Sequence, residues 1–188
     1  MPLGFPPLNF PLRRRLEAVR PRLYRLAYAW CHDAALADDL TQEALAKALV
    51  RADQLREEAA LEGWLFAILN NCWRDHLRGR REFVDVAELD EVILDEGPGP
   101  EQDYASHQVV RRVRRAIAEL PLGQRQVVSL VDIEECPYAE VARILGVPVG
   151  TVMSRLSRAR QALCQNLAEQ PAERQAGERS HPTIRRVK

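Results

Sequence analysis

Short hydroxyl and guanidinium side chains recur close together in the last third of the sequence. Arg suits nucleic-acid binding because its planar guanidinium can bind two phosphate oxygens, or two acceptors on a guanine edge, at once. Gly150 and Thr151 precede the cluster at the start of a predicted helix, where free backbone amides can hold a phosphate. The pattern therefore indicates DNA binding. The cluster consists of Ser154, Arg155, Ser157, Arg158 and Arg160.

Two short predicted helices around a glycine turn would position these side chains. In the first helix, the small Ala142 lies on the inner face and allows the second helix to cross closely. Gly146 supplies the permissive backbone of a tight turn, and Val147 fills that turn. The spacing predicts a helix-turn-helix whose second helix enters a major groove. The alternative is an ordinary helical hairpin with an exposed Arg-rich face. The inner face of the second helix is Val152, Leu156, Ala159 and Leu163.

Apolar residues recur at helical spacing over most of the chain, so we expect an all-α fold. The strongest stripe runs from Trp64 to Leu77 in steps of one, three and four residues, which is typical of a helix buried along a broad face. Two further stripes lie at 16–30 and 40–48. Helices of this number and size can close a small bundle over residues 13–84.

A composition break divides the chain into two predicted helical domains. Residues 85–104 are acidic and contain Gly97-Pro98-Gly99-Pro100, which cannot continue a helix, so we expect a flexible linker there. Helical spacing resumes over 105–167, which holds the helix-turn-helix. The proline-rich residues 1–12 and the polar residues 168–188 are expected to be loose tails.

Composition argues against several other functions. No stretch approaches the roughly 20 apolar residues of a membrane span, and the order of charges at the N-terminus does not fit a secretory signal, so we expect a cytoplasmic protein. The four cysteines have no paired spacing. Cys72 and His76 could share a helix face and bind a metal, but two further ligands have no obvious source, so we expect no metal or other cofactor. The sequence contains none of the GxSxG, HExxH and glycine-rich phosphate motifs of common enzyme classes.

Three blocks of the sequence resemble the sigma-70 family, in its short extracytoplasmic-function group. Ala37 to Leu45 is similar to the block that binds the polymerase clamp. Trp64 to Arg78 is similar to the helix that opens and reads the −10 promoter element. Leu120 to Arg160 is similar to the domain that binds the −35 element. The order and separation of the blocks in so short a chain make the resemblance specific, and it covers most of residues 13–167.

The resemblance implies roles for particular residues. Met153 departs from the basic or polar residue that relatives often carry in the recognition helix, and it could contact a thymine methyl or lose a contact. The implied polymerase-binding residues are Asp38, Asp39, Gln42 and Glu43. The implied −10 residues are Asn71, Asp75, Arg78, Arg80 and Arg81. The implied −35 residues are Gly150, Thr151, Met153, Ser154, Arg155, Ser157, Arg158 and Arg160.

The partners implied by the resemblance are core RNA polymerase, promoter DNA and an anti-sigma factor, often membrane-anchored, with no small-molecule substrate. Two DNA-binding modules on one tether would raise the effective concentration of the second contact. A stand-alone helix-turn-helix regulator is the alternative, but it leaves the two N-terminal blocks without a role. An enzyme is a second alternative, without a supporting motif.

Overall fold

The computed structural model describes residues 10–55, 57, 60–83 and 104–169, and within these ranges it is helical, with no strand. The prediction of an all-α fold is confirmed. The predicted acidic linker and most of both predicted tails lie outside the described residues. The elements are α1 (Phe10–Cys31), α2 (Ala34–Val50), the short 3-10 helix η1 (Ala52–Gln54), α3 (Leu61–Phe83), α4 (Tyr104–Ala118), α5 (Leu122–Val128), the π-helical turn η3 (Ser129–Ile133), α6 (Tyr138–Leu145) and α7 (Val149–Glu169).

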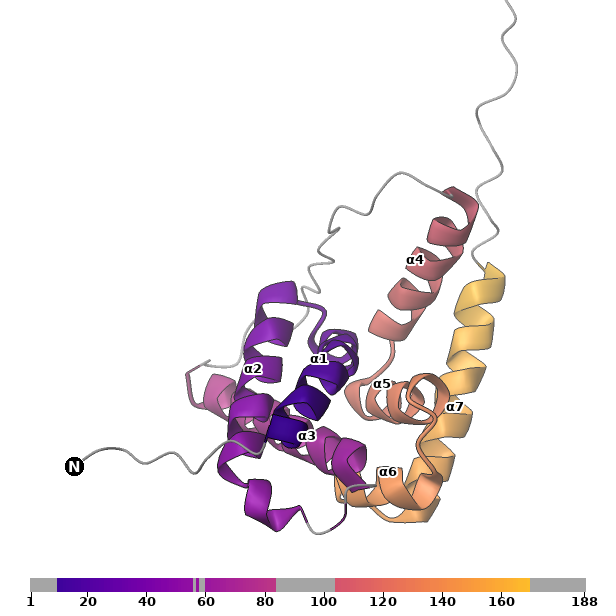
Figure 1. Cartoon of the computed structure of the whole chain (residues 1–188). Helices are drawn as coiled ribbons and strands as arrows, with labels where there is room; N and C mark the ends of the chain where they lie inside the picture. Colours follow the sequence, from indigo (N-terminus) through magenta and orange to yellow (C-terminus); the bar gives the residue numbers. More distant parts are fainter. Residues whose placement is uncertain (1–9, 56, 58–59, 84–103, 170–188) are drawn as a thin grey trace, which may run out of the picture.

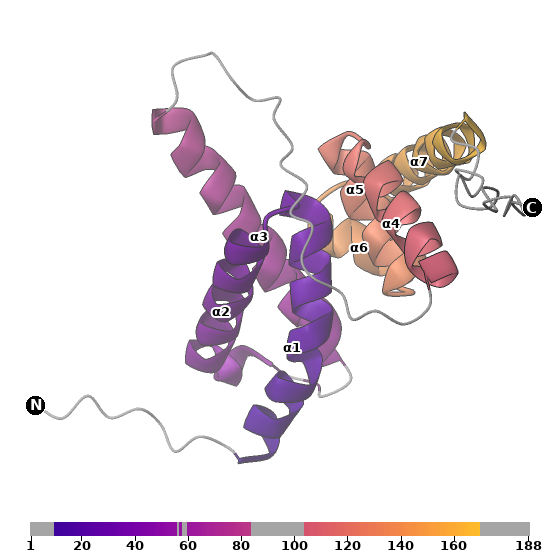
Figure 2. The same ribbon diagram turned by 90° about the horizontal axis from the view of Figure 1, so that it is seen from above.

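Helices α1, α2 and α3 form the N-terminal bundle, as Figures 1 and 2 show. The α1 stripe predicted from the sequence, residues 16–30, is buried, with Trp30 only 1% exposed. The helix ends at His32, whose left-handed φ of 54° stops α-helical propagation. Asp33 then caps α2, because its side chain accepts a hydrogen bond of 2.9 Å from the backbone amide of Leu36.

The α3 helix buries the apolar stripe that the sequence singled out. Leu65, Leu69 and Cys72 lie in the core, and Trp64 packs against it while remaining partly exposed. The indole of Trp73 is largely buried and stacks on the imidazole of His76, with ring centroids 5.7 Å apart. Trp64 is thus part of the bundle, as expected from its place in the stripe.

Helices α4 to α7 form the C-terminal half, and α6 and α7 make the helix-turn-helix. Gly146 ends α6 with φ 66° and ψ 38°, a left-handed conformation that glycine adopts without steric cost. The amide of Val147 donates to the carbonyl of Ala142 at 3.0 Å, which closes the turn as in a Schellman motif. Val152 and Leu156 are buried on the inner face of α7, as predicted.

The two halves pack directly against each other and share one continuous apolar core. Helix α1 contacts α5 and η3, and α3 contacts α6, so segments far apart in the sequence lie side by side (Figures 1 and 2). The sequence pattern predicted two domains but contained no signal for their contact. This contact is therefore the main feature of the architecture that only the structure provides.

Candidate nucleic-acid and protein interfaces

The outer face of the first half of α7 is open to solvent. Gly150, Met153, Ser154, Ser157 and Arg158 are all exposed, and Thr151 is half-buried at the start of the helix. The Met153 side chain, which departs from the usual residue type, is 54% exposed and available for an apolar contact. The Nε of Arg158 donates to the carbonyl of Ser154 at 3.2 Å, so its guanidinium lies along this face. The geometry suits a helix that enters a groove of DNA.

The other two arginines of the recognition helix are held by the protein itself. Arg160 donates two hydrogen bonds to the carboxylate of Asp132, at 2.5 and 3.2 Å, and this pairing raises the Arg160 pKa. Arg155 is half-buried, and its guanidinium lies beside Gly123, where an added Cβ would be within 3.1–3.3 Å of it. The sequence analysis gave the three arginines the same role, but in the structure Arg155 is half-buried and Arg160 is paired with Asp132, whereas Arg158 bonds only to Ser154 among the described residues.

The predicted −10 residues lie along the second half of α3. Asn71, Asp75, Arg78 and Arg80 are exposed, and the first three share the side of α3 opposite the buried stripe. Asp75 accepts a hydrogen bond of 3.1 Å from Arg78 and thereby helps to orient the guanidinium. Arg81 lies in α3, but its side chain is outside the described part of the chain.

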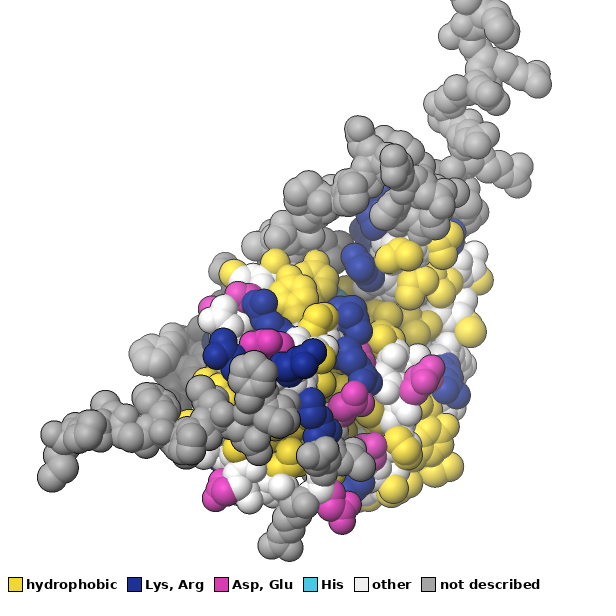
Figure 3. All heavy atoms as spheres, viewed as in Figure 1, with side chains coloured by type: hydrophobic (Ala, Val, Ile, Leu, Met, Phe, Trp, Pro, Cys, Tyr) yellow, Lys and Arg dark blue, Asp and Glu magenta, His cyan; other side chains and the backbone are white. Residues whose placement is uncertain are grey.

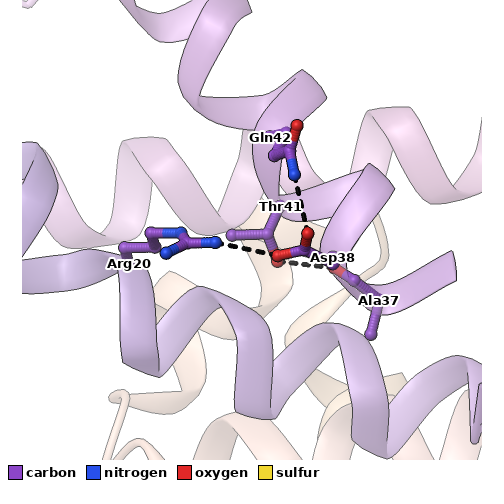
Figure 4. Close-up of polar contacts among 5 residues, drawn as sticks. All are labelled: Arg20, Ala37, Asp38, Thr41 and Gln42. Carbon is purple, nitrogen blue, oxygen red and sulfur yellow. Dashed lines mark hydrogen bonds and ion pairs between the residues drawn. The ribbon is translucent and has the colours of Figure 1, made fainter. Parts of the chain in front are cut away.

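The predicted polymerase-binding residues lie on α2, and Figure 4 shows two of them, Asp38 and Gln42, with the neighbouring Arg20. Asp38 accepts hydrogen bonds from Arg20 at 2.9 Å and from Gln42 at 2.6 Å, so its carboxylate is held in place at the surface. Asp39 is exposed, and Glu43 pairs with Lys47 at 2.7 Å. This surface is rich in carboxylates and can accept a basic surface of another protein. The same Lys47 lies 3.8 Å from Asp75, so the polymerase-binding and −10 surfaces adjoin.

Cys72 and His76 do not form a metal centre with any other residue that the structure describes. No group of three or more potential ligands is found within the described ranges. Cys72 is buried, and this burial raises the pKa of its thiol, which keeps it protonated and a poor ligand. None of the described helices combines the length and the apolar composition needed to cross a membrane.

Sequence reasoning missed a set of polar residues that join the two halves. Asn70, only 2% exposed on α3, donates to the carbonyl of Ile144 in α6 at 3.0 Å and accepts from Gln126 in α5 at 3.1 Å. Arg22 of α1 pairs with Glu134, which follows η3, at 2.6 Å. No periodicity or motif could have indicated these pairs, because each joins residues 56 or more positions apart.

A half-buried arginine makes a further connection between the halves. Arg125 of α5 donates to the carbonyl of Trp30 at 2.8 Å and to that of Leu120 at 3.0 Å. The Trp30 carbonyl lies in the last turn of α1, where carbonyls lack partners within the helix and the helix dipole favours a cation. Burial lowers the pKa of Arg125. Arg125 therefore ties the end of α1 to the start of α5.

Two family patterns match the chain. Residues 16–83 match the family described as Sigma-70 region 2, and residues 111–163 match Sigma-70, region 4. The chain is 36% identical over 158 residues to the ECF RNA polymerase sigma factor EcfG of Rhodopseudomonas palustris, which covers 84% of this chain and 85% of the relative. It is 33% identical over 165 residues to the RNA polymerase sigma-H factor of Pseudomonas aeruginosa, covering 82% of this chain and 84% of the relative.

Solved structures show the same arrangement of helices. The sigma factor RpoE in complex with the anti-sigma factor NepR from Bartonella quintana is similar with a TM-score of 0.68 and 28% identity, over 84% of this chain and 96% of that one. CnrH in complex with the cytosolic domain of CnrY is similar with a TM-score of 0.57 and 25% identity, over 85% and 91% of the two chains. Each of these similarities therefore includes both helical halves of the chain.

Proposed function

Because this chain belongs to the extracytoplasmic-function group of the sigma-70 family, we propose that its two helical halves divide promoter recognition between them. The chain is an alternative sigma factor, which directs RNA polymerase to promoters and catalyses no reaction of its own. The N-terminal half, 13–84, binds the polymerase and the −10 element. The C-terminal half, 105–167, binds the −35 element.

The −35 element is read by the exposed face of α7, and this face is the observation that carries the proposal. Ser154, Ser157 and Arg158 contact phosphates and base edges, while Gly150 offers its backbone amide to a phosphate. The Thr151 amide was expected to be free, but it donates to the carbonyl of Pro148 at 2.9 Å. Met153 contributes an apolar contact that suits a thymine methyl. Arg155 and Arg160 also contact the DNA. The guanidinium of Arg155 lies beside Gly123, and that of Arg160 is hydrogen-bonded to Asp132.

The −10 element is held by the exposed face of α3. Asn71, Asp75, Arg78, Arg80 and Arg81 contact the unpaired strand, and the capture of its bases offsets an unstacking cost of a few kcal/mol. Strand opening then needs no ATP, because base capture and polymerase contacts supply the free energy. The N-terminal half thus stabilises the unpaired form of the duplex.

The polymerase binds the carboxylate-rich surface of α2. Asp38, Asp39, Gln42 and Glu43 pair with basic groups on the clamp. The ordered carboxylate of Asp38 is already aligned by Arg20 and Gln42, so less conformational entropy is lost on binding.

An anti-sigma factor is the regulatory partner, as in the sigma–anti-sigma complexes that this chain resembles. We expect the chain to act in the cytoplasm and its anti-sigma factor to be anchored in the membrane. The product of a neighbouring gene with one membrane-spanning helix is the first candidate. Co-expression of its cytoplasmic part with this chain, followed by co-purification, tests the assignment.

Reconstitution with bacterial core RNA polymerase tests the proposed function. The promoter probe is a DNA fragment selected by the reconstituted holoenzyme from a random-sequence pool. We expect Arg158→Ala to reduce promoter-dependent transcription about tenfold, since one phosphate or base contact contributes roughly 1–3 kcal/mol. Arg114→Ala is the matched control, because Arg114 is also exposed but lies on α4 and not on α7. Absence of any promoter-dependent transcript with the wild-type chain would contradict the proposal.

Polymerase binding is tested separately. Asp39→Lys reverses one exposed charge of the α2 surface and should weaken co-purification with core polymerase. Glu17→Lys makes the same charge change on α1, where Glu17 is 63% exposed and pairs only locally with Arg13. Equal loss with both variants would show that net charge, and not the α2 surface, governs the interaction.

The stand-alone regulator is not favoured. That function uses a helix-turn-helix alone, whereas residues 16–83 match region 2 of the sigma-70 family and form a complete bundle with its own exposed polar surfaces. Co-purification with core polymerase distinguishes the two functions.

A further inference from the structure

An ion pair beside α7 places a carboxylate next to the proposed DNA-binding face. Arg160 lies on the same stripe of α7 as Met153 and Ser157, because residues at these spacings of four and three share one face of a helix. All three residues are exposed. Asp132 comes from η3, the turn between α5 and α6, and its carboxylate accepts two hydrogen bonds from Arg160. A negative charge therefore lies at one end of a surface that would meet phosphates.

The guanidinium of Arg160 has a defined orientation in this pair. Its Nε and Nη2 atoms donate to the two carboxylate oxygens of Asp132 at 3.2 and 2.5 Å, so Asp132 occupies the side-on edge of the guanidinium. The end-on edge, formed by Nη1 and Nη2, is not used by Asp132 and can meet a further acceptor. Arg160 can therefore bind a phosphate at one place with the pair intact, but a phosphate elsewhere only by breaking the pair.

The backbone that carries Asp132 is anchored in the core. The amide of Glu134 donates to the carbonyl of Ser129 at 3.1 Å, and the amide of Cys136 donates to that of Leu130 at 2.9 Å. Ser129 and Leu130 are completely buried. The η3 turn is π-helical, a rare conformation that often occurs at functional sites. Asp132 is thus presented to Arg160 from a fixed position.

Folding stability does not account for this ion pair. The side chains of Arg160 and Asp132 are 53% and 32% exposed, so water screens both charges. Exposed pairs contribute little to folding, because the screened attraction is offset by the loss of side-chain freedom. Figure 3 shows few Asp and Glu side chains over α4 and α7, and a carboxylate close to phosphates opposes DNA binding by like-charge repulsion. The position of Asp132 therefore indicates a role in how DNA is bound.

We propose that Asp132 is a specificity-determining residue of the DNA-binding face, which holds Arg160 so that this arginine binds a phosphate only in the register set by the promoter. The inference rests on the proposed reading of the −35 element by α7. On other DNA, α7 has no fixed register, and Asp132 remains the better partner for Arg160. Non-specific binding is electrostatic, so the loss of one available cation weakens it directly. Specific binding keeps its base contacts, and its advantage over non-specific binding increases.

Asp132→Asn tests this role, because it removes the charge and keeps the size of the side chain. The full chain is titrated with two duplexes of equal length, one with the −35 element of the promoter fragment selected by the holoenzyme and one with the shuffled sequence. Fluorescence anisotropy at several KCl concentrations measures both affinities. The variant should bind the shuffled duplex about three- to eightfold more tightly at about 0.1 M salt, since one added phosphate contact steepens the dependence of log K on log salt by about 0.9. Affinity for the −35 duplex should change less than about twofold, because Arg160 already contacts a phosphate there.

Three further variants separate this role from net charge and from a structural effect. Arg160→Ala with Asp132→Asn should bind the shuffled duplex as Arg160→Ala does, because Asp132 acts through Arg160. Asp132→Glu keeps a carboxylate and should restore the wild-type salt dependence. Glu119→Gln makes the same charge change directly after α4, where Glu119 pairs with Arg115 and Asn166, and should leave both affinities unchanged.

Each outcome bears on the proposal. An equal gain of affinity on both duplexes, or no gain on the shuffled duplex, would overturn the role of Asp132 in specificity. A gain that persists in the Arg160→Ala background would show an effect of net charge and would overturn it as well. The shuffled duplex requires no promoter. If no promoter fragment can be selected, the proposed function fails, while the salt dependence on shuffled DNA still decides whether Asp132 restrains Arg160. Absence of binding by every chain would contradict both.

Discussion

Because of His32, we expect the free energy of unfolding of this sigma factor to fall in mild acid. The imidazole is 5% exposed at the end of α1, and its buried Nε2 has no hydrogen-bond partner among the residues that the structure describes. Burial and, secondarily, the positive charge of Arg125 lower the pKa of His32 to about 4. Arg125 is also the residue that joins the end of α1 to α5. Protonation of His32 would therefore place two cations together at the contact between the halves.

The sign and size of the effect follow from proton linkage. An unfolded chain protonates His32 at its ordinary pKa of 6.5, whereas the folded chain does so only near 4. Between these pH values the unfolded state holds more protons, so the free energy of unfolding falls as the pH is lowered. The loss is about 2 kcal/mol at pH 5 and about 3 kcal/mol at pH 4, at 1.36 kcal/mol per pKa unit. It is absent above pH 7.

The measurement is urea unfolding at pH 7, 5 and 4, followed by tryptophan fluorescence, for the wild-type chain and His32→Asn. Asn tolerates the left-handed backbone of this position and does not titrate. Loss of packing changes the free energy of unfolding of the variant by the same amount at every pH. The pH dependence of the difference between the two chains therefore reports the titration of the imidazole. As the pH is lowered from 7 to 4, we expect the free energy of unfolding of the variant to rise by about 3 kcal/mol relative to that of the wild-type chain. Parallel pH profiles for the two chains would refute the reasoning.

Three further predictions concern the C-terminal half. Gly146→Ala should lower the free energy of unfolding by about 1–2 kcal/mol, because its φ of 66° is strained for residues with a Cβ; Gly150→Ala, in open space within α7, should not. Thermal unfolding checks both. Leu130→Ala should cost about 2–5 kcal/mol in chemical denaturation, since this side chain is fully buried. In a promoter-binding assay, Arg160→Ala should reduce affinity less than Arg158→Ala, because the Arg160 guanidinium is shared with Asp132. An equal or larger loss would show that the pair with Asp132 does not weaken the contact of Arg160 with DNA.

Much of the helix-turn-helix could be predicted because its determinants are local. The small Ala142, the glycine at 146 and the apolar spacing of α7 lie within one short segment, and each has a direct steric consequence. The same holds for the stripe of α3, whose periodicity placed Leu65 and Leu69 in the core. The residues proposed for promoter and polymerase binding were indicated mainly by resemblance, and the structure shows which of them are open.

The sequence by itself determined the helical class, the division into two halves and the chemistry of the α7 surface, because side-chain period, glycine turns and residue type act over a few positions. Only the tertiary structure decided how the halves meet. Nothing in the local sequence distinguishes Asn70 or Glu134 from the other polar residues of the chain. Their roles arise from partners 56 and 112 residues away. Such pairings depend on the global packing of α1 and α3 against α5 and α6, which no local pattern encodes.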